Sequence, residues 1–163
     1  DFRALEHMQQ QIHQVVGRAG REKTQGVVHI QTAYPEHPLW RYIKRHDYLG
    51  GVSYLLKERE EIGLPPYSYQ AVFCIRHKQQ KKAETLMHIV WRDLMEKRLH
   101  GKVYRPMPAQ YAKLQDTYSY ILLLQAPKSS SLRRDIVSLQ NLLETYLWSK
   151  SVAYFIDIDP LEY

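Results

Sequence analysis

The sequence predicts an α/β (α+β) chain: part of one sheet domain, a helical linker, and then a complete domain with a four-stranded sheet. Three observations favour this division. After residue 66, β-rich and amphipathic segments alternate in the order strand-helix-strand-strand-helix-strand. Before residue 34, only the run at residues 26–32 has the β-branched composition of a strand. Between the two regions, Gly63-Leu64-Pro65-Pro66 is typical of a boundary between domains.

The first segment, residues 1–33, begins with a predicted helix from Ala4 to about Ala19. Its apolar residues share one face at helical spacing: Leu5, Met8, Ile12 and Val15 or Val16. A polar loop leads to a strand predicted at Gly26–Thr32. Because a single strand leaves both of its edges unpaired, we expect residues 1–33 to be the end of a sheet domain.

Residues 34–66 are predicted to form the helical linker. A short helix is expected from Leu39 to about Arg45, and a second from about Val52 to Ile62. Between them, Gly50-Gly51 is expected to interrupt helical structure, since glycine is a poor helix former. The Gly-Leu-Pro-Pro sequence then ends the second helix.

Residues 67–163 are predicted to form a ferredoxin-like domain, the split βαβ arrangement in which two helices cover one face of a four-stranded sheet. The expected elements are a strand at Tyr67–Arg76, a helix at Lys81–Arg98, strands at Lys102–Met107 and Tyr118–Gln125, a helix after the serines, and a strand at Val152–Asp157. The run Ser129-Ser130-Ser131 is expected to supply the N-cap of the second helix. Many functions occur on this fold, so the fold alone assigns none.

The charge of the chain indicates an anionic partner. The formal net charge is +6 and the isoelectric point is about 9.3. Most of the excess follows residue 66, where 14 Lys and Arg face 9 Asp and Glu. This favours nucleic acid or an acidic peptide as the partner of the second region. A basic surface that serves only solubility is the alternative.

Composition also excludes several classes of site. The single cysteine, Cys74, rules out an internal disulfide and a cysteine-based zinc site, and its apolar neighbours predict a buried thiol. The scattered histidines suggest no metal site. No apolar run approaches the ~18 residues that a membrane span requires, so no membrane partner is expected. The composition fits a reducing compartment.

The stretch from Gln14 to Arg21 is the first candidate site. Gly17 and Gly20 can let the backbone approach a ligand, and Arg18 and Arg21 can present two guanidinium groups to one phosphoryl group. A helix C-cap followed by a solvated basic loop explains the same residues. The chain has no Gly-x-x-x-x-Gly-Lys-Ser/Thr loop, so we do not expect it to hydrolyse nucleotide by itself.

Two basic sites are candidates in the second region. The first is a run of cations for which both binding and simple solvation are open: Arg76, Lys78, Lys81, Lys82, Arg92, Lys97, Arg98, Lys102 and Arg105. The second is Arg133-Arg134, in the first turn of the last predicted helix, where two guanidinium groups and free backbone N–H groups suit a carboxylate or a phosphate.

Several landmarks together resemble the PriA family of bacterial primosomal helicases. The stretch Gln-x-x-Gly-Arg-Ala-Gly-Arg followed by a Gly-Val-Val strand resembles motif VI of superfamily 2 helicases. Further landmarks follow in the family's order: Gln31-Thr32, Pro35-Glu36-His37-Pro38, Glu58-Arg59, Leu64-Pro65-Pro66-Tyr67 and Asp157-Ile158-Asp159-Pro160-Leu161. They span nearly the whole chain and resemble the carboxy-terminal portion of the family.

The resemblance implies roles for the candidate residues. Residues 1–33 would be the tail of the second RecA-like helicase lobe, with Arg18 and Arg21 as arginine-finger candidates and Gln14, Gly17 and Gly20 at the ATP site. ATP and Mg would belong to the full-length protein, as would zinc bound outside this fragment, and no cofactor is expected here.

The resemblance also implies partners. The last domain would bind forked or single-stranded DNA. The candidate contacts are Arg76, Lys78, Lys81, Lys82, Lys102 and Arg105. Arg133 and Arg134 would help to hold the acidic tail of single-stranded-DNA-binding protein, and other primosome proteins would be further partners.

The main hypothesis is therefore a carboxy-terminal fragment of an ATP-dependent 3′-5′ DNA helicase that restarts stalled replication forks in the bacterial cytoplasm. The fragment is expected to be inactive alone and to act as a DNA- and partner-binding module. One alternative is a stand-alone nucleic-acid-binding α/β module with no ATPase role, in which the Gly/Arg loop contacts phosphate. Another is a structural domain without a ligand.

Overall fold

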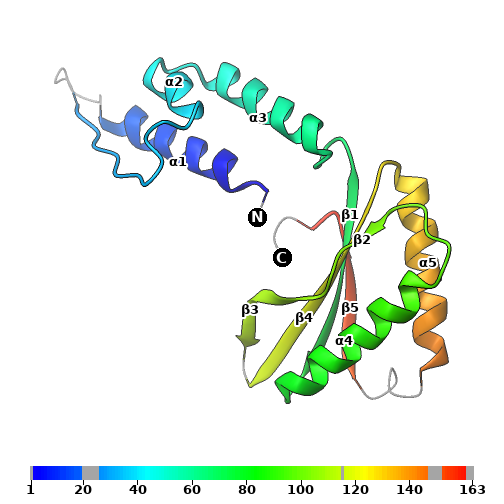
Figure 1. Ribbon diagram of the computed structural model, residues 1–163. Helices are drawn as coiled ribbons and strands as arrows, with labels where there is room; N and C mark the ends of the chain where they lie inside the picture. Colours follow the sequence, from blue (N-terminus) through cyan, green and yellow to red (C-terminus); the bar gives the residue numbers. More distant parts are fainter. Residues whose placement is uncertain (1, 20–25, 115, 147–151, 161–163) are drawn as a thin grey trace. The chain divides into compact units, whose positions relative to one another are not determined.

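A computed structural model describes residues 2–19, 26–114, 116–146 and 152–160 of the 163-residue chain (Figure 1). The chain divides into two compact units, Asp1–Ile62 and Gly63–Tyr163. Among the described residues, the elements of the first unit are helices, and those of the second are the strands of a sheet and two helices. No helix in the described ranges has the length and apolar character needed to cross a bilayer.

The described part of the first unit has three helices, α1 (Ala4–Ala19), α2 (Leu39–Lys44) and α3 (Tyr48–Ile62). The predicted apolar stripe of α1 is confirmed for Leu5, Met8 and Ile12, which pack against a small core contributed by the other two helices, but its predicted end is not, since Val15 is 53% exposed. The buried residues of this core are Leu39, Trp40, Ile43 and Leu55. An ion pair between Arg59 and Glu6, with Nη2 and Oε2 2.8 Å apart, adds a polar link between α3 and α1.

Helix α3 begins earlier than predicted, because the two glycines do not interrupt it. The Asp47 carboxylate accepts a hydrogen bond from the Gly50 N–H at 2.8 Å, which caps the new first turn. A side chain at Gly51 would have its Cβ 2.2 Å from the Gln9 amide nitrogen, so the glycine allows α1 to approach α3. Tertiary packing outweighs the low helix propensity of glycine at this point.

The strand predicted at Gly26–Thr32 is wrong, since these residues have no regular secondary structure. Two of their apolar side chains are exposed to solvent, Val27 by 72% and Ile30 by 43%. A β-strand is stabilised by hydrogen bonds to a neighbouring strand, and none of the described residues supplies that neighbour. Residues 26–32 therefore have the composition of a strand but no described strand to pair with.

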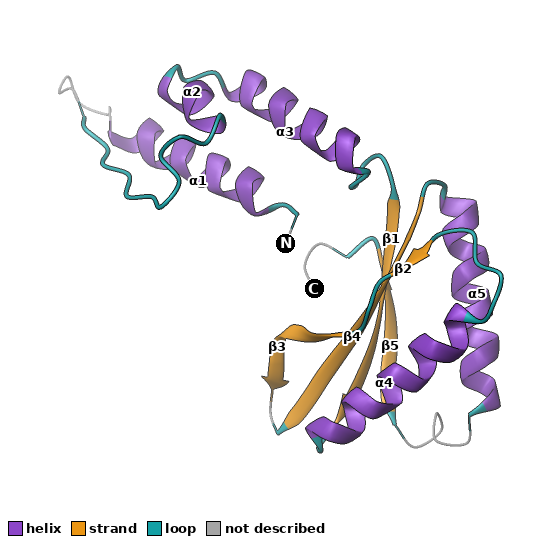
Figure 2. Cartoon of the chain, in the orientation of Figure 1, coloured by secondary structure: helices purple, strands orange, loops and turns teal. Residues whose placement is uncertain are grey.

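The second unit has the predicted α+β architecture, and Figure 2 shows its sheet with helices α4 and α5. Its elements are β1 (Tyr69–His77), α4 (Gln80–Met95), β2 (Lys102–Val103), β3 (Met107–Leu114), β4 (Thr117–Ala126), α5 (Ser129–Thr145) and β5 (Ala153–Ile158). The strand order is β2-β4-β1-β5, and β3 also pairs with β4. All of these pairs are antiparallel.

The sheet has five strands rather than the predicted four. The expected strand at Lys102–Met107 is two strands, since β2 ends at Val103 and β3 begins at Met107. Pro106 lies between them and has no N–H to donate to a ladder, which accounts for the interruption. Beyond it β3 continues to Leu114 alongside β4, with a shift of register between Pro108 and Lys113.

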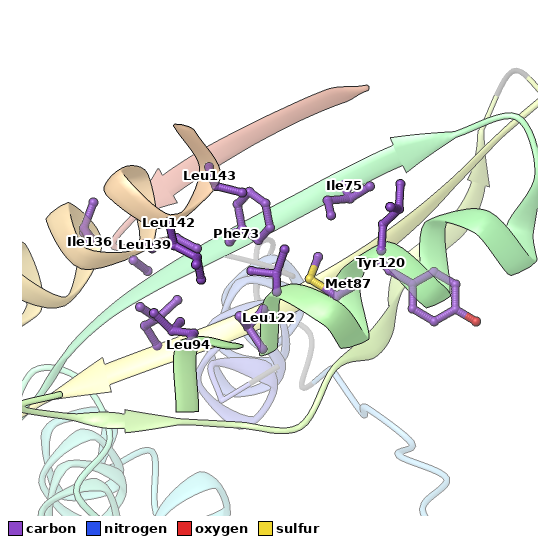
Figure 3. Close-up of a cluster of buried hydrophobic side chains, with 14 of the residues drawn as sticks. Phe73, Ile75, Met87, Leu94, Tyr120, Leu122, Ile136, Leu139, Leu142 and Leu143 are labelled. Atoms are coloured by element: carbon purple, nitrogen blue, oxygen red, sulfur yellow. The ribbon is translucent and has the colours of Figure 1, made fainter. Parts of the chain in front are cut away.

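The main core lies between one face of the sheet and the two helices, as Figure 3 shows. Alternate residues of β1 and β4 point into it, among them Phe73, Ile75 and Leu122. Cys74 lies on the opposite face in a smaller buried cluster with Ile121, so the predicted burial of the thiol is confirmed. Desolvation by that burial raises the pKa of the Cys74 thiol above its usual value.

The expected serine N-cap of α5 is wrong by one position. Lys128 is the N-cap residue and makes no capping hydrogen bond with its side chain, while Ser129–Ser131 form the first helical turn. The serines favour a helix start in this region, but their hydroxyl groups are already inside the helix.

Candidate functional site

The Gly/Arg stretch lies partly in α1, where Gln14, Gly17 and Arg18 are exposed. Helix α1 continues through Gly17 to Ala19, in agreement with the predicted range of this helix. A Cβ there would meet no atom within 4 Å, and the backbone at Gly17 does not form a ligand cradle. Gly20 and Arg21 lie outside the described residues, so the pairing of the two arginines stays a prediction.

The cations of the second unit form two separate groups. The first, which we call the α4 group, surrounds the connection from β1 to α4, and all of its members are exposed: Arg76, Lys78, Lys81 and Lys82. It lies at one end of the sheet, where Arg76 of β1 pairs with Ser119 of β4. No acidic residue occupies the first turn of α4 to neutralise these charges.

The second group, which we call the β2 group, lies toward the other end of the sheet, where Lys102 pairs with Gln125. Its exposed members come from segments that are distant in sequence: Lys97, Arg98, Lys102, Arg105, Arg133 and Arg134. Between Ser119 and Gln125, β4 advances about 20 Å at ~3.4 Å per residue. The basic run that is continuous in the sequence is therefore divided in the structure into the α4 group and the β2 group. Figure 2 shows α4 running between the two ends of the sheet.

Asp135 draws the two parts of the β2 group toward each other. Its side chain is buried, and its carboxylate accepts hydrogen bonds from the backbone N–H groups of His100 at 2.9 Å and Gly101 at 2.8 Å. These bonds attach α5, just after Arg133 and Arg134, to the segment that leads into Lys102. Sequence reasoning treated the two basic sites as separate and missed Asp135, whose position on the apolar face of α5 was the available signal.

Two further contacts change the status of sequence candidates. Arg92 forms an ion pair with Asp93, with 2.8 Å between Nε and Oδ1, so it is already partnered. The Arg76 guanidinium lies 4.8 Å from the ring centroid of Phe155, a cation–π distance. Phe155 is 40% exposed, and sequence reasoning missed it because an aromatic residue in a strand is ordinarily assigned to the core.

The described residues contain no group of three or more His, Cys, Asp or Glu side chains suited to hold a metal ion. Exposed Lys and Arg side chains suit the binding of phosphate or carboxylate groups by charge and hydrogen bonding. In chemical terms the second unit presents two exposed cationic surfaces.

Comparison with known proteins identifies the family. Residues 60–161 match the family model of the primosomal protein N C-terminal domain. The chain belongs to this family. Both cation groups lie within the residues that match the primosomal protein N model, whereas the Gly/Arg stretch precedes them.

Relatives confirm the resemblance to PriA. The replication restart protein PriA of Haemophilus influenzae is 34% identical over 98% of this chain, and the match covers 22% of that protein. The PriA proteins of Synechocystis sp. and Bacillus subtilis are 31% and 30% identical over 99% and 98% of the chain, and the matches cover 19% and 20% of their lengths. The chain thus spans about a fifth of the length of these relatives.

Among solved structures, the de novo designed protein Foldit4 matches 57% of this chain and 97% of its own length, with a TM-score of 0.43 and 9% identity.

Proposed function

We propose that the chain is the carboxy-terminal part of a bacterial replication-restart helicase and that its second unit binds branched DNA. The observation that carries this proposal is the pair of exposed cation groups at opposite ends of one sheet. Phosphate contacts by Lys and Arg supply most of the affinity in sequence-independent DNA binding. Two groups about 20 Å apart along the strands can contact two duplex arms, or one duplex and one single strand, at a junction.

In the longer protein, residues 1–33 would complete a second RecA-like helicase lobe. The segment at Gly26–Thr32 supports this proposal, because it has strand composition but pairs with no strand among the described residues of its own unit. Arg18 and Arg21 would then reach ATP and Mg held mainly by the other lobe, and the enzyme would be a cytoplasmic ATP-dependent 3′-5′ DNA helicase. This chain alone would have no ATPase activity.

We also propose a protein partner, the acidic tail of single-stranded-DNA-binding protein, for Arg133 and Arg134. Both side chains are exposed in the second turn of α5, because the helix begins at Ser129, so the predicted first-turn position is wrong. The first turn contains no acidic residue that would repel an anion.

Binding to a fluorescein-labelled fork of random sequence, measured by anisotropy as a function of salt, tests the DNA proposal. We expect the affinity for the fork to fall steeply as the salt concentration rises. Charge reversal at either end of the sheet, by Lys81→Glu with Lys82→Glu or by Lys102→Glu with Arg105→Glu, removes phosphate contacts. We expect each double variant to weaken binding by about tenfold or more and to reduce the dependence of affinity on salt. Lys57→Glu, an exposed lysine of α3, is the matched control. Absence of fork binding at low salt would overturn the proposal.

A further inference from the structure

Phe155 of β5 lies on the face of the sheet opposite helices α4 and α5. Successive side chains of β1 alternate between the two faces: Phe73 and Ile75 point into the core beneath the helices (Figure 3), whereas Cys74 belongs to the smaller cluster on the other face. Phe155 is the partner of Cys74 in the antiparallel ladder, and directly opposed residues share a face. Its side chain is 40% exposed, so a large part of the ring is open to solvent.

The ring can be reached from the edge of the sheet. Strand β5 comes last in the strand order, with β1 on one side and no described strand on the other. The preceding β5 residue on the same face is Ala153, which is exposed and pairs with Arg76. A methyl group rather than a large side chain therefore borders Phe155 in the direction of Arg76, and a planar ligand has room to approach.

The Arg76 guanidinium adds a second planar group beside the ring. It lies 4.8 Å from the Phe155 ring centroid, and Arg76 is itself exposed. Nucleic-acid bases stack both on aromatic rings and on the plane of an arginine guanidinium. The two side chains together therefore present a planar, positively charged surface that suits an unpaired base.

The rest of the α4 group continues the positive charge beyond Arg76. Along β1, Arg76 lies two residues, or about 7 Å, past the level of Phe155. The connection from β1 to α4 is held by a hydrogen bond from the Gln79 N–H to His77 Nδ1 at 2.9 Å. The remaining cations of the group lie on this connection and in the first turn of α4: Lys78, Lys81 and Lys82. Phosphates that follow a base at Phe155 can contact these lysines.

Asp157 gives the surface a direction. Its carboxylate is exposed and shares the face of Phe155, two residues or about 7 Å further along β5, on the side away from Arg76. Phosphate groups are repelled on that side and attracted on the side of the lysines. A single strand with one base on Phe155 therefore leaves the ring toward α4.

We propose that Phe155 and Arg76 form a stacking site for an unpaired base, so that the α4 group binds a single-stranded segment of the DNA rather than a duplex arm. Bases inside a duplex are already stacked on one another, and they offer no free face to an exposed ring, whereas the bases of a single strand do. The inference rests on the proposed function and refines it, because it assigns one kind of DNA strand to one end of the sheet.

Anisotropy with the full chain and a fluorescein-labelled oligothymidine tests the stacking site. We expect Phe155→Leu, which keeps an apolar side chain but removes the aromatic plane, to weaken binding about tenfold, and Phe155→Trp to retain it. The matched control is Tyr34→Leu, which removes an aromatic side chain that is 76% exposed in the first unit. If Phe155→Leu binds oligothymidine as tightly as the parent protein, the stacking site is overturned.

An oligomer of abasic nucleotides separates stacking from phosphate contacts, because it keeps the phosphates and lacks the bases. We expect the parent protein to bind it about tenfold more weakly than oligothymidine, and Phe155→Leu to cause no further loss. An equal loss with both oligomers in Phe155→Leu would show that the substitution disturbs the phosphate contacts, and this would also overturn stacking.

A junction whose arms are all duplex distinguishes failure of this inference from failure of the proposed function. We expect Phe155→Leu to bind it within about twofold of the parent protein, since it has no unpaired base to stack. Binding of the junction with no effect of Phe155→Leu on oligothymidine would remove the stacking site and leave branched-DNA binding intact. Loss of oligothymidine binding in Phe155→Leu, without any binding of a fork or junction by the parent protein, would support stacking and overturn branched-DNA binding.

Discussion

The two units of this chain bury their apolar residues to very different extents. In the second unit, strands and helices close around one core that includes fully buried Phe73, Leu122 and Leu139. In the first unit, helices α1 to α3 share a small core, and the β-rich segment that follows α1 remains exposed. Because the second unit has the larger closed core, we expect it to contribute more to the stability of the chain than the first.

The largest expected effect is in the closed core. We expect Leu122→Ala to lower the free energy of unfolding of the second unit by about 3 kcal/mol, because it removes a fully buried side chain from the centre of the sheet. Trp91 packs against the core of the second unit and reports its unfolding by fluorescence once Trp40 and Trp148 are replaced by Phe, whereas Trp40 reports on the first unit once Trp91 and Trp148 are replaced. A parallel loss of the Trp40 transition would show that the two units do not unfold independently.

Leu55→Ala is the matched change in the first unit. Its core is smaller and more open, so the surrounding residues can relax further around the lost side chain, and we expect a smaller cost of about 2 kcal/mol. Urea denaturation followed at Trp40 measures it. A cost equal to or above that of Leu122→Ala would contradict the contrast between the two cores.

A middle-sized effect concerns the buried carboxylate that joins α5 to the start of β2. We expect Asp135→Ala to destabilise the second unit by about 2 kcal/mol, because it leaves the N–H groups of His100 and Gly101 without their acceptor. Thermal unfolding by circular dichroism measures the change. Asp135→Asn keeps one acceptor oxygen and should cost less; if both variants match the parent protein, the carboxylate does not hold this end of the domain together.

The smallest effect is confined to the first unit. The pKa of Tyr54 is raised to about 12, mainly because its hydroxyl donates a hydrogen bond to Glu58 and secondarily because the side chain is partly desolvated. Since the folded pKa exceeds the usual ~10 of tyrosine, the stability from this bond is complete below pH 10 and is lost as pH rises toward 12. Titration of the ultraviolet absorbance against pH compares Tyr54→Phe with the parent protein. We expect the variant to lack one phenol that titrates near pH 12 in the parent. Removal of a phenol that titrates near pH 10 would show that the bond to Glu58 does not form in solution.

Sequence reasoning succeeded where the signal was local. The apolar spacing of α1 and the alternation in β1 and β4 were enough to predict these elements and the faces that they bury. It failed at Gly50-Gly51 and at residues 26–32, where the outcome depends on a partner. The glycines stay helical because α1 packs closely against Gly51, and the predicted strand is missing because none of the described residues of the first unit forms a strand beside it.

For the candidate site, too, the residue types could be predicted from the sequence but their arrangement could not. Residue types alone identified most of the exposed cations, since Lys and Arg are seldom buried. Their grouping could not be predicted, because the run from Arg76 to Arg105 crosses the length of the sheet while Asp135 draws Arg133 and Arg134 toward Lys102.

The sequence by itself determined the mixed α+β class, the family, the cationic character of the second unit and the burial of Cys74, because these depend on composition, periodicity and motif. Only the tertiary structure decided which cations lie together, which strand edge remains open and which segment lacks a partner. Those properties come from hydrogen bonds and packing between residues far apart in the chain, such as Asp135 with Gly101, and no local pattern encodes them.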